Sequence, residues 1–198
     1  MDVRWIFTWH DPIKEQEAAK SLFDAGAQVV MTGADTPAPA QVAPEGKWGI
    51  TYDYSGNCTV DACLTSMYWN WGPIYADIVE LSRNDEWVGG WEYFDADSGG
   101  MGLYGFMEGE TLQPGVAELP AEELQLIEST LEMMLNGDFD RFDVFSGPIT
   151  DNQGNVILAE GESLEQVDLD GFQQFGSDCE TCMYWWNENI TAELPELD

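Results

Sequence analysis

Short apolar runs alternate with helical segments in the N-terminal part of the chain, and this alternation constrains the fold more than any other feature. Residues 3–8, 28–32 and 48–52 have the length and apolar character of buried strands. Residues 12–25 carry apolar side chains on one side, as an amphipathic helix does, and residues 38–43 are expected to form a short second helix. A strand–helix–strand repeat predicts an α/β fold with a parallel sheet and right-handed crossovers.

Capping residues support the two longest expected helices. Asp11 and Pro12 combine an N-cap acceptor with proline at the first helical position, and Gly26 is a typical C-terminal stop. Residues 120–136 show a second amphipathic pattern, which Gly137 ends. We therefore expect two well-defined helices with these bounds.

Beyond the first repeat the pattern becomes less regular. Residues 72–82 are expected to form a helix, whereas residues 84–115 are rich in glycine and aromatic residues and are expected to hold short strands and a crossing segment. Further strands are expected at residues 64–68, 142–145 and 156–158. Residues 150–155 have the composition of a turn that leads into the last of these strands.

The charge balance excludes one class of partner. Asp and Glu number 38 against 6 Lys and Arg, so the formal net charge is -32. A field of this sign repels phosphate backbones and anionic membrane surfaces, so we expect no nucleic-acid partner. The surplus carboxylates are typical either of a solvated acidic surface or of adaptation to high salt, where screening removes their mutual repulsion.

The N-terminus and the cysteines favour different cellular compartments. Residues 1–4 lead into a short apolar run and a charged helix without a small-residue cleavage site, which is not typical of a signal peptide. The cysteines form two close pairs, Cys58 with Cys63 and Cys179 with Cys182, and local disulfides would fit an oxidising compartment. A four-thiolate zinc site and free thiols are the alternatives, although the spacing of the first pair is loose for zinc.

Polar and aromatic side chains follow each expected strand of the sheet. Because the carboxyl ends of parallel strands meet at one edge, where open α/β sheets bind ligands, we expect these loops to form a site. Rings can stack on a flat or apolar ligand face, and carboxylates can bind hydroxyls or amines. The candidate ligand-binding residues are Trp9, Asp11, Thr32, Gly33, Asp35, Thr36, Asp53, Trp69, Asn70 and Trp71.

Several candidates also have an ordinary structural explanation. Asp11 and Asp35 are each placed to cap the helix that follows. Trp69 and Trp71 precede a helix, and packing beneath that helix is an equally good interpretation. His10 has no serine or cysteine nucleophile nearby and is expected to be a surface residue.

Sequence signatures of common enzymes are missing. The chain contains no G-x-S-x-G, Walker or H-E-x-x-H motif, and no G-x-G-x-x-G after a strand. The glycine-rich residues 99–102 lack the lysine of a phosphate loop, and paired carboxylates mean little in a chain with so many acids. We therefore expect neither catalysis nor a cofactor or catalytic metal.

Four segments carry a more specific signal. Residues 9–19 contain W-H-D-P and K-E-Q-E-A-A, and residues 24–30 read D-A-G-A-Q-V-V. Residues 64–73 read L-T-S-M-Y-W-N-W-G-P, and residues 145–154 contain F-S-G-P-I and D-N-Q-G. In this order, the segments resemble the basic membrane protein family, the PnrA-like substrate-binding lipoproteins of ABC transporters.

The resemblance implies a type I periplasmic-binding-protein-like fold, in which two α/β lobes close on a solute across a hinge of crossing strands. Residues 1–95 would form most of the family's second lobe, and residues 96–198 a crossover segment, a partial first lobe and a C-terminal tail. Family members are longer and begin with a lipoprotein signal and the first part of lobe one. The fold is therefore expected to have one incomplete lobe, as in a truncated or split gene product.

The resemblance also implies a function. The chain would be the solute-binding component of an ABC importer, capturing a small polar organic solute, nucleoside-like or related, without catalysis. Its partners would be that solute and ABC permease subunits, and it would act as a monomer in the periplasm or at the extracellular face of the plasma membrane. Asp53 falls where nucleoside-binding members place a ribose-binding carboxylate, but Trp69 replaces their ligand-contacting lysine, which leaves the solute open.

Two other function classes stay open on the sequence alone. One is an enzyme or sensor domain that retains a periplasmic-binding-like lobe. The other is an interaction module stabilised by zinc through the four cysteines. Product formation would favour the first alternative, and stoichiometric zinc would favour the second.

Overall fold

The computed structural model describes residues 1–89, 93–170 and 185–192, and the chain divides into two compact units. The larger unit spans Ile6–Asp138, and the smaller unit joins Met1–Trp5 to Phe139–Asp198. The lobe boundary expected near residue 95 falls inside the larger unit. The assignment of the residues after it to another lobe stays a prediction.

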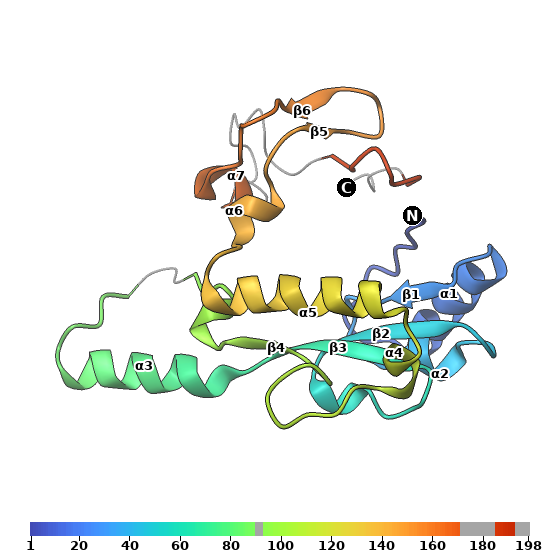
Figure 1. Ribbon diagram of the computed structural model, residues 1–198, viewed down its shortest axis with the longest axis horizontal. Coiled ribbons are helices and arrows are strands. Elements are labelled where there is room, and N and C mark those ends of the chain that lie inside the picture. The colour runs from blue at the N-terminus through green and yellow to red at the C-terminus, as the bar shows by residue number, and fades with distance from the viewer. Residues whose placement is uncertain (90–92, 171–184, 193–198) are drawn as a thin grey trace. The chain divides into compact units, whose positions relative to one another are not determined.

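A four-stranded sheet organises the larger unit (Figure 1). Its strands, in spatial order, are β1 Val29–Met31, β2 Trp48–Asp53, β3 Cys63–Trp69 and β4 Met101–Leu103. The first three are parallel, and β4 runs antiparallel to β3. The predicted α/β fold with a parallel-rich sheet and flanking helices is confirmed.

In the described part of the larger unit, the three long helices and the first short helix lie close to their predicted positions, whereas the other short helical segments were not predicted. The three long ones are α1 Pro12–Asp24, α3 Trp71–Arg83 and α5 Ala121–Asn136. The short ones are α2 Ala38–Val42, α4 Pro114–Ala117 and the 3-10 turns η1 Ser55–Asn57 and η2 Ala96–Ser98. Gly137 ends α5 as predicted, with a φ of 76° that glycine adopts without strain.

The core of the larger unit lies between the first helices and the sheet. Ala19 and Phe23 of α1 bury their side chains against Val30 of β1. At the next strand, α2 approaches so closely that a Cβ on Gly49 would lie 2.3 Å from the backbone nitrogen of Ala40. Any larger residue at Gly49 would push α2 off the sheet.

Helix α3 is packed differently from α1 and α2. It leaves the end of β3 and extends away from the sheet (Figure 1). Of its residues, all of which are described, only Ile74 is buried, whereas Tyr75 and Val79 are exposed. The start of α3 is therefore open to solvent beside the end of β3.

In its described residues, the smaller unit contains a β-hairpin and two short helices. Strands β5 Ile149–Thr150 and β6 Val156–Leu158 pair antiparallel, and the helices are α6 Arg141–Val144 and α7 Gln166–Asp170. In the turn, the Asp151 carboxylate accepts hydrogen bonds from the backbone nitrogens of Gln153 (2.9 Å) and Asn155 (2.7 Å) and from Nδ2 of Asn155 (2.8 Å). The predicted turn between two strands is confirmed.

The strand expected at residues 3–8 is wrong. This segment pairs with no strand in the described part of the chain, and Phe7 has a φ of 54°, outside the extended region. The Trp5 ring instead lies 5.8 Å from the ring of Trp186, within the smaller unit. Apolar composition favours a strand only where a neighbouring strand takes up its backbone hydrogen bonds.

The strand expected at residues 142–145 is also wrong, because residues 142–144 belong to helix α6 and Phe145 is its C-cap. The Asp140 carboxylate accepts hydrogen bonds from the backbone nitrogens of Phe142 (2.7 Å) and Asp143 (3.2 Å). The Asp143 carboxylate in turn accepts one from the backbone nitrogen of Asp140 (2.9 Å). This reciprocal capping box fixes a helical turn where the apolar pattern alone predicted extended chain.

Candidate functional site

The carboxyl ends of β1, β2 and β3 lie at one edge of the sheet, because these strands are parallel. The loop before α1 reaches the same edge. The backbone nitrogen of Asp35, which follows β1, donates to the carbonyl oxygen of Trp9 at 2.8 Å. Trp9 is therefore held beside the second loop, although residues 3–8 form no strand.

A buried glutamate fixes these two loops together. Glu15 of α1 is only 4% exposed, and its Oε1 accepts a hydrogen bond from the backbone nitrogen of Asp11 at 2.9 Å. Its Oε2 accepts from the backbone nitrogen of Thr36 at 3.2 Å and also from the Thr36 hydroxyl. A carboxylate is tolerated at such a buried position when it accepts several hydrogen bonds. Glu15 is not among the residues predicted from the sequence, although an acid in the first helical turn after an N-cap is a usual capping partner.

Asn57, which the sequence analysis also missed, connects the second loop to the third. Its Nδ2 donates to the carbonyl oxygens of Tyr52 at 3.0 Å and Asp35 at 3.4 Å. Asp53 follows Tyr52 directly in the chain. This one amide therefore holds together the segments that carry Asp35 and Asp53.

Four aromatic rings continue from this place along the edge and onto α3. We call Tyr52, Trp69, Trp71 and Tyr75 the aromatic run. Ring centroids are separated by 6.3 Å for Tyr52 and Trp69, 5.9 Å for Trp69 and Trp71, and 5.8 Å for Trp71 and Tyr75. Trp71 is 51% exposed and Tyr75 is 60% exposed, so both rings are open to a ligand. Tyr75 comes one helical turn after Trp71, and this spacing could have identified it from the sequence.

Asp35 and Asp53 supply the uncommitted charge of the site. Both residues are exposed, and neither carboxylate has a hydrogen-bond or ion-pair partner among the described residues. Asp53 has a φ of 74°, a left-handed conformation that few residues other than glycine, asparagine and aspartate adopt. Backbone outliers of this kind cluster at ligand sites, which makes Asp53 the stronger of the two candidates.

Four other predicted site residues, Asp11, Thr32, Thr36 and Asn70, make side-chain hydrogen bonds within the fold. Thr36 is buried against Glu15, and Gly33 and Trp9 are exposed. Oδ1 of Asp11 accepts hydrogen bonds from the backbone nitrogens of Ile13 (3.2 Å) and Lys14 (3.1 Å). Oγ1 of Thr32 accepts one from the backbone nitrogen of Ala34 (2.9 Å), and Nδ2 of Asn70 donates one to the carbonyl oxygen of Gly99 (3.0 Å). Asp11 is therefore the N-cap of α1, as its structural interpretation predicted.

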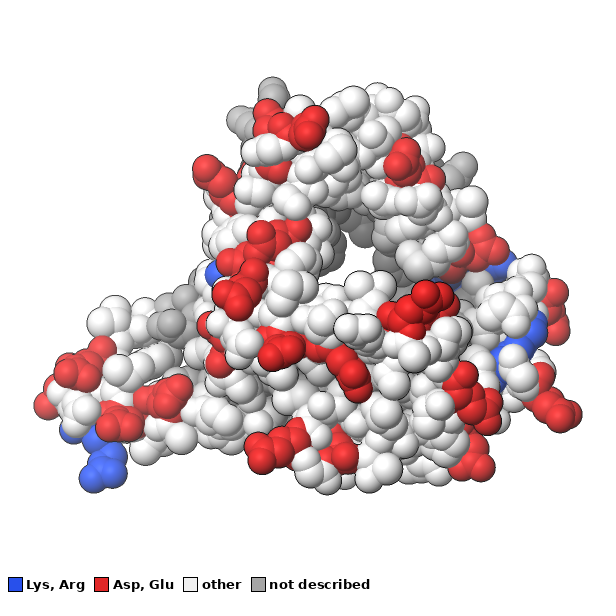
Figure 2. Space-filling model, viewed as in Figure 1, with Lys and Arg blue, Asp and Glu red and all other residues white. Residues whose placement is uncertain are grey.

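The electrostatic surroundings of the site are acidic. Figure 2 shows patches of acidic groups scattered over the visible face of the larger unit, whereas basic groups lie near the far end of α3 and near α1. One of the few cations, Lys14, lies 3.8 Å from Oδ2 of Asp11. A field of this sign favours neutral or cationic solutes over anions.

Tyr68 neighbours Trp69 in β3 but takes part in a different contact. Its hydroxyl donates to Oε1 of Glu110 at 3.2 Å, and Oε2 of Glu110 accepts from the backbone nitrogen of Gly105 at 2.7 Å. Partial burial, followed by the charge and hydrogen bond of Glu110, raises the pKa of Tyr68. Tyr68 therefore remains a protonated hydrogen-bond donor at neutral pH, and its bond to Glu110 helps to hold the loop after β4 in place.

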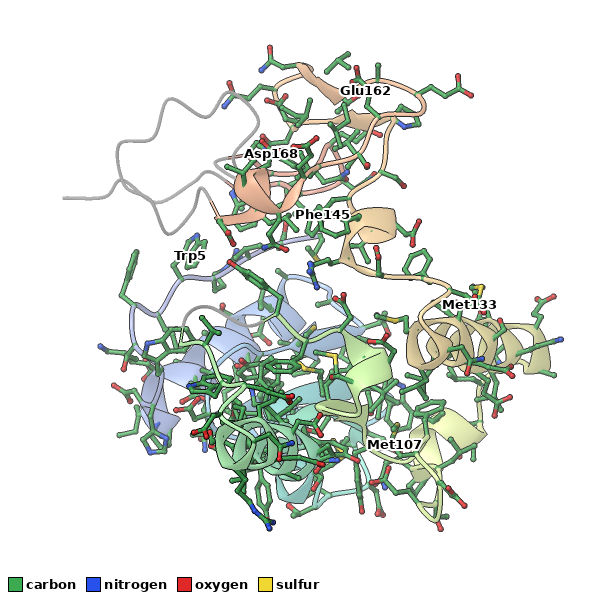
Figure 3. All side chains as sticks on the ribbon, turned by 90° about the vertical axis from the view of Figure 1, so that its left-hand side faces the viewer. Trp5, Met107, Met133, Phe145, Glu162 and Asp168 are labelled. Atoms are coloured by element: carbon green, nitrogen blue, oxygen red, sulfur yellow. A yellow bond between two sulfur atoms is a disulfide. The ribbon has the colours of Figure 1, made fainter. Side chains whose placement is uncertain are left out.

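A separate hollow of about 320 Å³ lies between α5 and this loop. In Figure 3, Met107 marks the loop and Met133 marks α5. The lining residues are Gly105, Phe106, Met107, Glu110, Leu112, Glu128, Leu131, Glu132, Leu135 and Asn136. The hollow shares no residue with the aromatic run or with Asp35 and Asp53.

The cysteines bear on the zinc alternative. Cys58 and Cys63 form a disulfide, which removes two of the four thiolates that such a site needs. Cys179 and Cys182 lie outside the described residues. Within the described residues, no group of three His, Cys, Asp or Glu side chains could hold a metal ion. None of the helices in these same residues is long and apolar enough to cross a membrane.

Comparison with known proteins identifies relatives over most of the chain. The model of the family described as ABC transporter substrate-binding protein PnrA-like matches residues 1–131. A purine-binding protein from Brucella abortus is 28% identical over 174 residues, covering 85% of this chain and 45% of the relative. A putative ABC transporter glucose-binding protein from Haloferax volcanii is 30% identical over 158 residues, covering 79% of this chain and 37% of the relative. The chain thus spans less than half the length of the curated relatives it matches.

A solved structure supports the fold. A transcriptional activator of the comK gene from Bacillus halodurans superimposes with a TM-score of 0.55 at 17% identity. The match covers 70% of this chain and 47% of the other. At this level of identity the likeness concerns the fold alone.

Proposed function

Because the chain belongs to the PnrA-like family of ABC transporter substrate-binding proteins, we propose that the edge of its parallel sheet binds a small polar organic solute for import. The resemblance is confirmed by the family model, and three of the four segments that carried it, residues 9–19, 24–30 and 64–73, lie within the matched residues. The fourth segment, residues 145–154, lies outside the match. The family is non-catalytic, so the protein is a binding component and not an enzyme.

The aromatic run is the observation that carries the proposal. Its two exposed rings, Trp71 and Tyr75, can stack on the flat or apolar face of a cyclic solute, at about 0.5–1.5 kcal/mol per ring pair beyond the area buried. Asp35 and Asp53 can accept hydrogen bonds from its hydroxyl or amino groups. A ring-bearing neutral solute, nucleoside-like or related, uses both features.

The names of the relatives agree with a ring-bearing solute. One is called purine-binding and the other glucose-binding. A purine presents a π face and a pyranose presents an apolar face of C–H groups, and either can lie on Trp71. Neither solute carries a negative charge, which suits the acidic surroundings of the site.

The rest of the transport cycle follows from the family fold. This chain would supply one wall of the binding site, and the opposing lobe would close over the solute. The closed form would deliver the solute to the permease subunits at the outer face of the membrane, with the binding protein acting as a monomer. The binding protein itself catalyses no step of this cycle.

Titration calorimetry on the purified chain tests the proposal. Adenosine, guanosine and glucose form one panel, and the corresponding phosphates form another. We expect one neutral solute to bind at a 1:1 ratio and to be recovered unchanged, with Trp71→Ala weakening binding and Leu126→Ala, at an exposed apolar position on α5, leaving it unchanged. Preferential binding of a phosphate, chemical conversion of the solute, or no binding by any neutral member would contradict it.

A further inference from the structure

The sequence contains two Asn-x-Thr triplets, Asn57-Cys58-Thr59 and Asn189-Ile190-Thr191. In exported proteins this triplet is the acceptor signal for N-linked glycosylation. The triplet alone is a weak signal, because short motifs recur by chance. The two triplets have different surroundings in the structure. We propose that Asn189 carries an N-linked glycan whereas Asn57 does not.

Asn189 has room for a glycan. It is exposed and lies in a β-turn that the backbone nitrogen of Ile190 closes onto the oxygen of Asn187 at 2.9 Å. Its side-chain Nδ2 donates one hydrogen bond, to Oδ1 of Asn187 at 3.0 Å. An amide nitrogen that bears a sugar keeps one N–H, which is sufficient for this bond. The folded turn therefore accommodates the modified side chain without losing a contact.

Asn57 has the opposite surroundings. Its Nδ2 donates to two backbone oxygens, those of Tyr52 and Asp35, and both bonds lie at the solute site. The next residue, Cys58, is buried and bonded to Cys63. A sugar on Asn57 would remove one of the two N–H donors that connect the second and third loops. It would also place a bulky group beside the aromatic run.

The chemistry is a group transfer from a lipid-linked oligosaccharide phosphate or diphosphate. A bond forms between Nδ2 of Asn189 and C1 of the first sugar, and the C1–oxygen bond to the phosphate breaks. The lipid phosphate leaves with the electron pair, and the amide loses one proton to a base of the transferase. The Thr191 hydroxyl bonds to Asp2 and to the carbonyl oxygen of Met1 in the fold, so transfer would precede the docking of this segment.

The inference rests on the proposed location of the protein outside the membrane, where the transfer takes place. The test therefore uses the full chain exported behind a cleavable secretion leader, in a host that glycosylates Asn-x-Thr sites of its own exported proteins. Intact-mass spectrometry and peptide mapping of the secreted protein report the glycan. Calorimetry on the same sample reports solute binding, so failure of the glycan and failure of the proposed function give different results.

We expect one glycan per chain, located on the Asn189 peptide. Asn189→Gln and Thr191→Ala should abolish it, whereas Thr191→Ser, which preserves the triplet, and Asn57→Gln should retain it. The inference would be overturned if Asn189 of the secreted protein is unmodified while a host protein with the same triplet is glycosylated. Modification of Asn57 in place of Asn189 would overturn it as well.

Discussion

The two halves of the sheet edge are built from similar residue types, but the fold uses them in different ways. On the side of α1, the Glu15 carboxylate, the Asp11 carboxylate and the Thr36 hydroxyl are all bonded to neighbouring backbone or to one another. On the side of α3, Asp53 and the rings of Trp71 and Tyr75 are exposed, and the rings of Tyr52 and Trp69 are partly exposed. The comparison shows which polar residues after the strands already have their hydrogen bonds within the fold and which are left free to contact a ligand.

The first half therefore sets the position of the second. Glu15 holds the loops around Asp11 and Thr36, and Asn57 connects the second loop to the end of β2. Changes on the α1 side should reduce the stability of the larger unit. Changes on the α3 side should reduce affinity for the solute and leave stability nearly unchanged.

The largest expected effect is that of Glu15→Ala. The change leaves the backbone nitrogens of Asp11 and Thr36 without their acceptor in a buried place, so the free energy of unfolding should fall by roughly 3 kcal/mol. Urea denaturation followed by tryptophan fluorescence measures it. Glu17→Ala, at an exposed position of the same helix, is the control and should change it little. Equal effects for the two variants would show that the bonds of Glu15 do not hold these loops.

Asp53→Asn should have the next largest effect, and on binding only. Asparagine tolerates the left-handed φ of 74° that alanine would not, so the substitution removes the charge without straining the backbone. Loss of one charge-assisted hydrogen bond should weaken solute binding by about 1.5–3 kcal/mol in calorimetry. Asp61→Asn, at another exposed acid in the following loop, should bind as the unmodified protein does. A lowered unfolding temperature with unchanged affinity would assign Asp53 to the fold.

Trp71→Ala should produce a smaller loss of affinity, about tenfold, because it removes stacking area but no charge. The ring is half exposed, so the unfolding temperature should stay close to that of the unmodified protein. Trp71→Phe keeps an aromatic face and should recover part of the affinity. If the phenylalanine variant is as weak as the alanine variant, stacking is not the interaction at this position.

The smallest expected effect is a pH dependence of hairpin stability, which comes from the hydrogen-bonded Asp151 carboxylate in the smaller unit. The hydrogen bond from the Asn155 side chain, with backbone bonds from the same turn, lowers the pKa of Asp151 below its ordinary value near 3.8. A carboxyl with a depressed folded pKa contributes stability above its unfolded pKa, and this contribution is lost as pH falls through the folded pKa. The hairpin should therefore loosen below about pH 4.

Amide hydrogen exchange in the hairpin, measured between pH 5 and pH 3, checks this prediction. Protection corrected for the intrinsic exchange rate should fall across that range in the unmodified protein. Asp151→Asn should reduce the pH dependence and lower protection at pH 5. An unmodified protein whose corrected protection is constant across the range would contradict the role given to Asp151.

Secondary structure could be predicted most accurately where local sequence signals and tertiary contacts agree. Asp11 and Gly137 mark the ends of α1 and α5 because the cap geometry is local. Residues 3–8 and 142–145 look like strands by composition, but the first lacks a neighbouring strand and the second has a capping box. Strand formation depends on a partner elsewhere in the chain, which composition does not reveal.

The site was predictable only in part for a related reason. The rule that ligands gather at the carboxyl ends of parallel strands placed Asp53, Trp69 and Trp71 at one edge. It could not separate them from Thr32 or Asn70, because only the fold shows whose hydrogen bonds are already made. Asn57 and Tyr52 were missed, since their roles depend on contacts between different loops.

The most direct test of the proposed site follows the indole N–H signals of the tryptophans by NMR during titration with the neutral solute that binds best. We predict that the signals of Trp69 and Trp71 shift in a saturable way, while that of Trp48, which lies beside Gly115 at the start of β2, does not. Saturable binding that shifts Trp48 or other indoles and leaves Trp69 and Trp71 unchanged would contradict a solute site at the aromatic run.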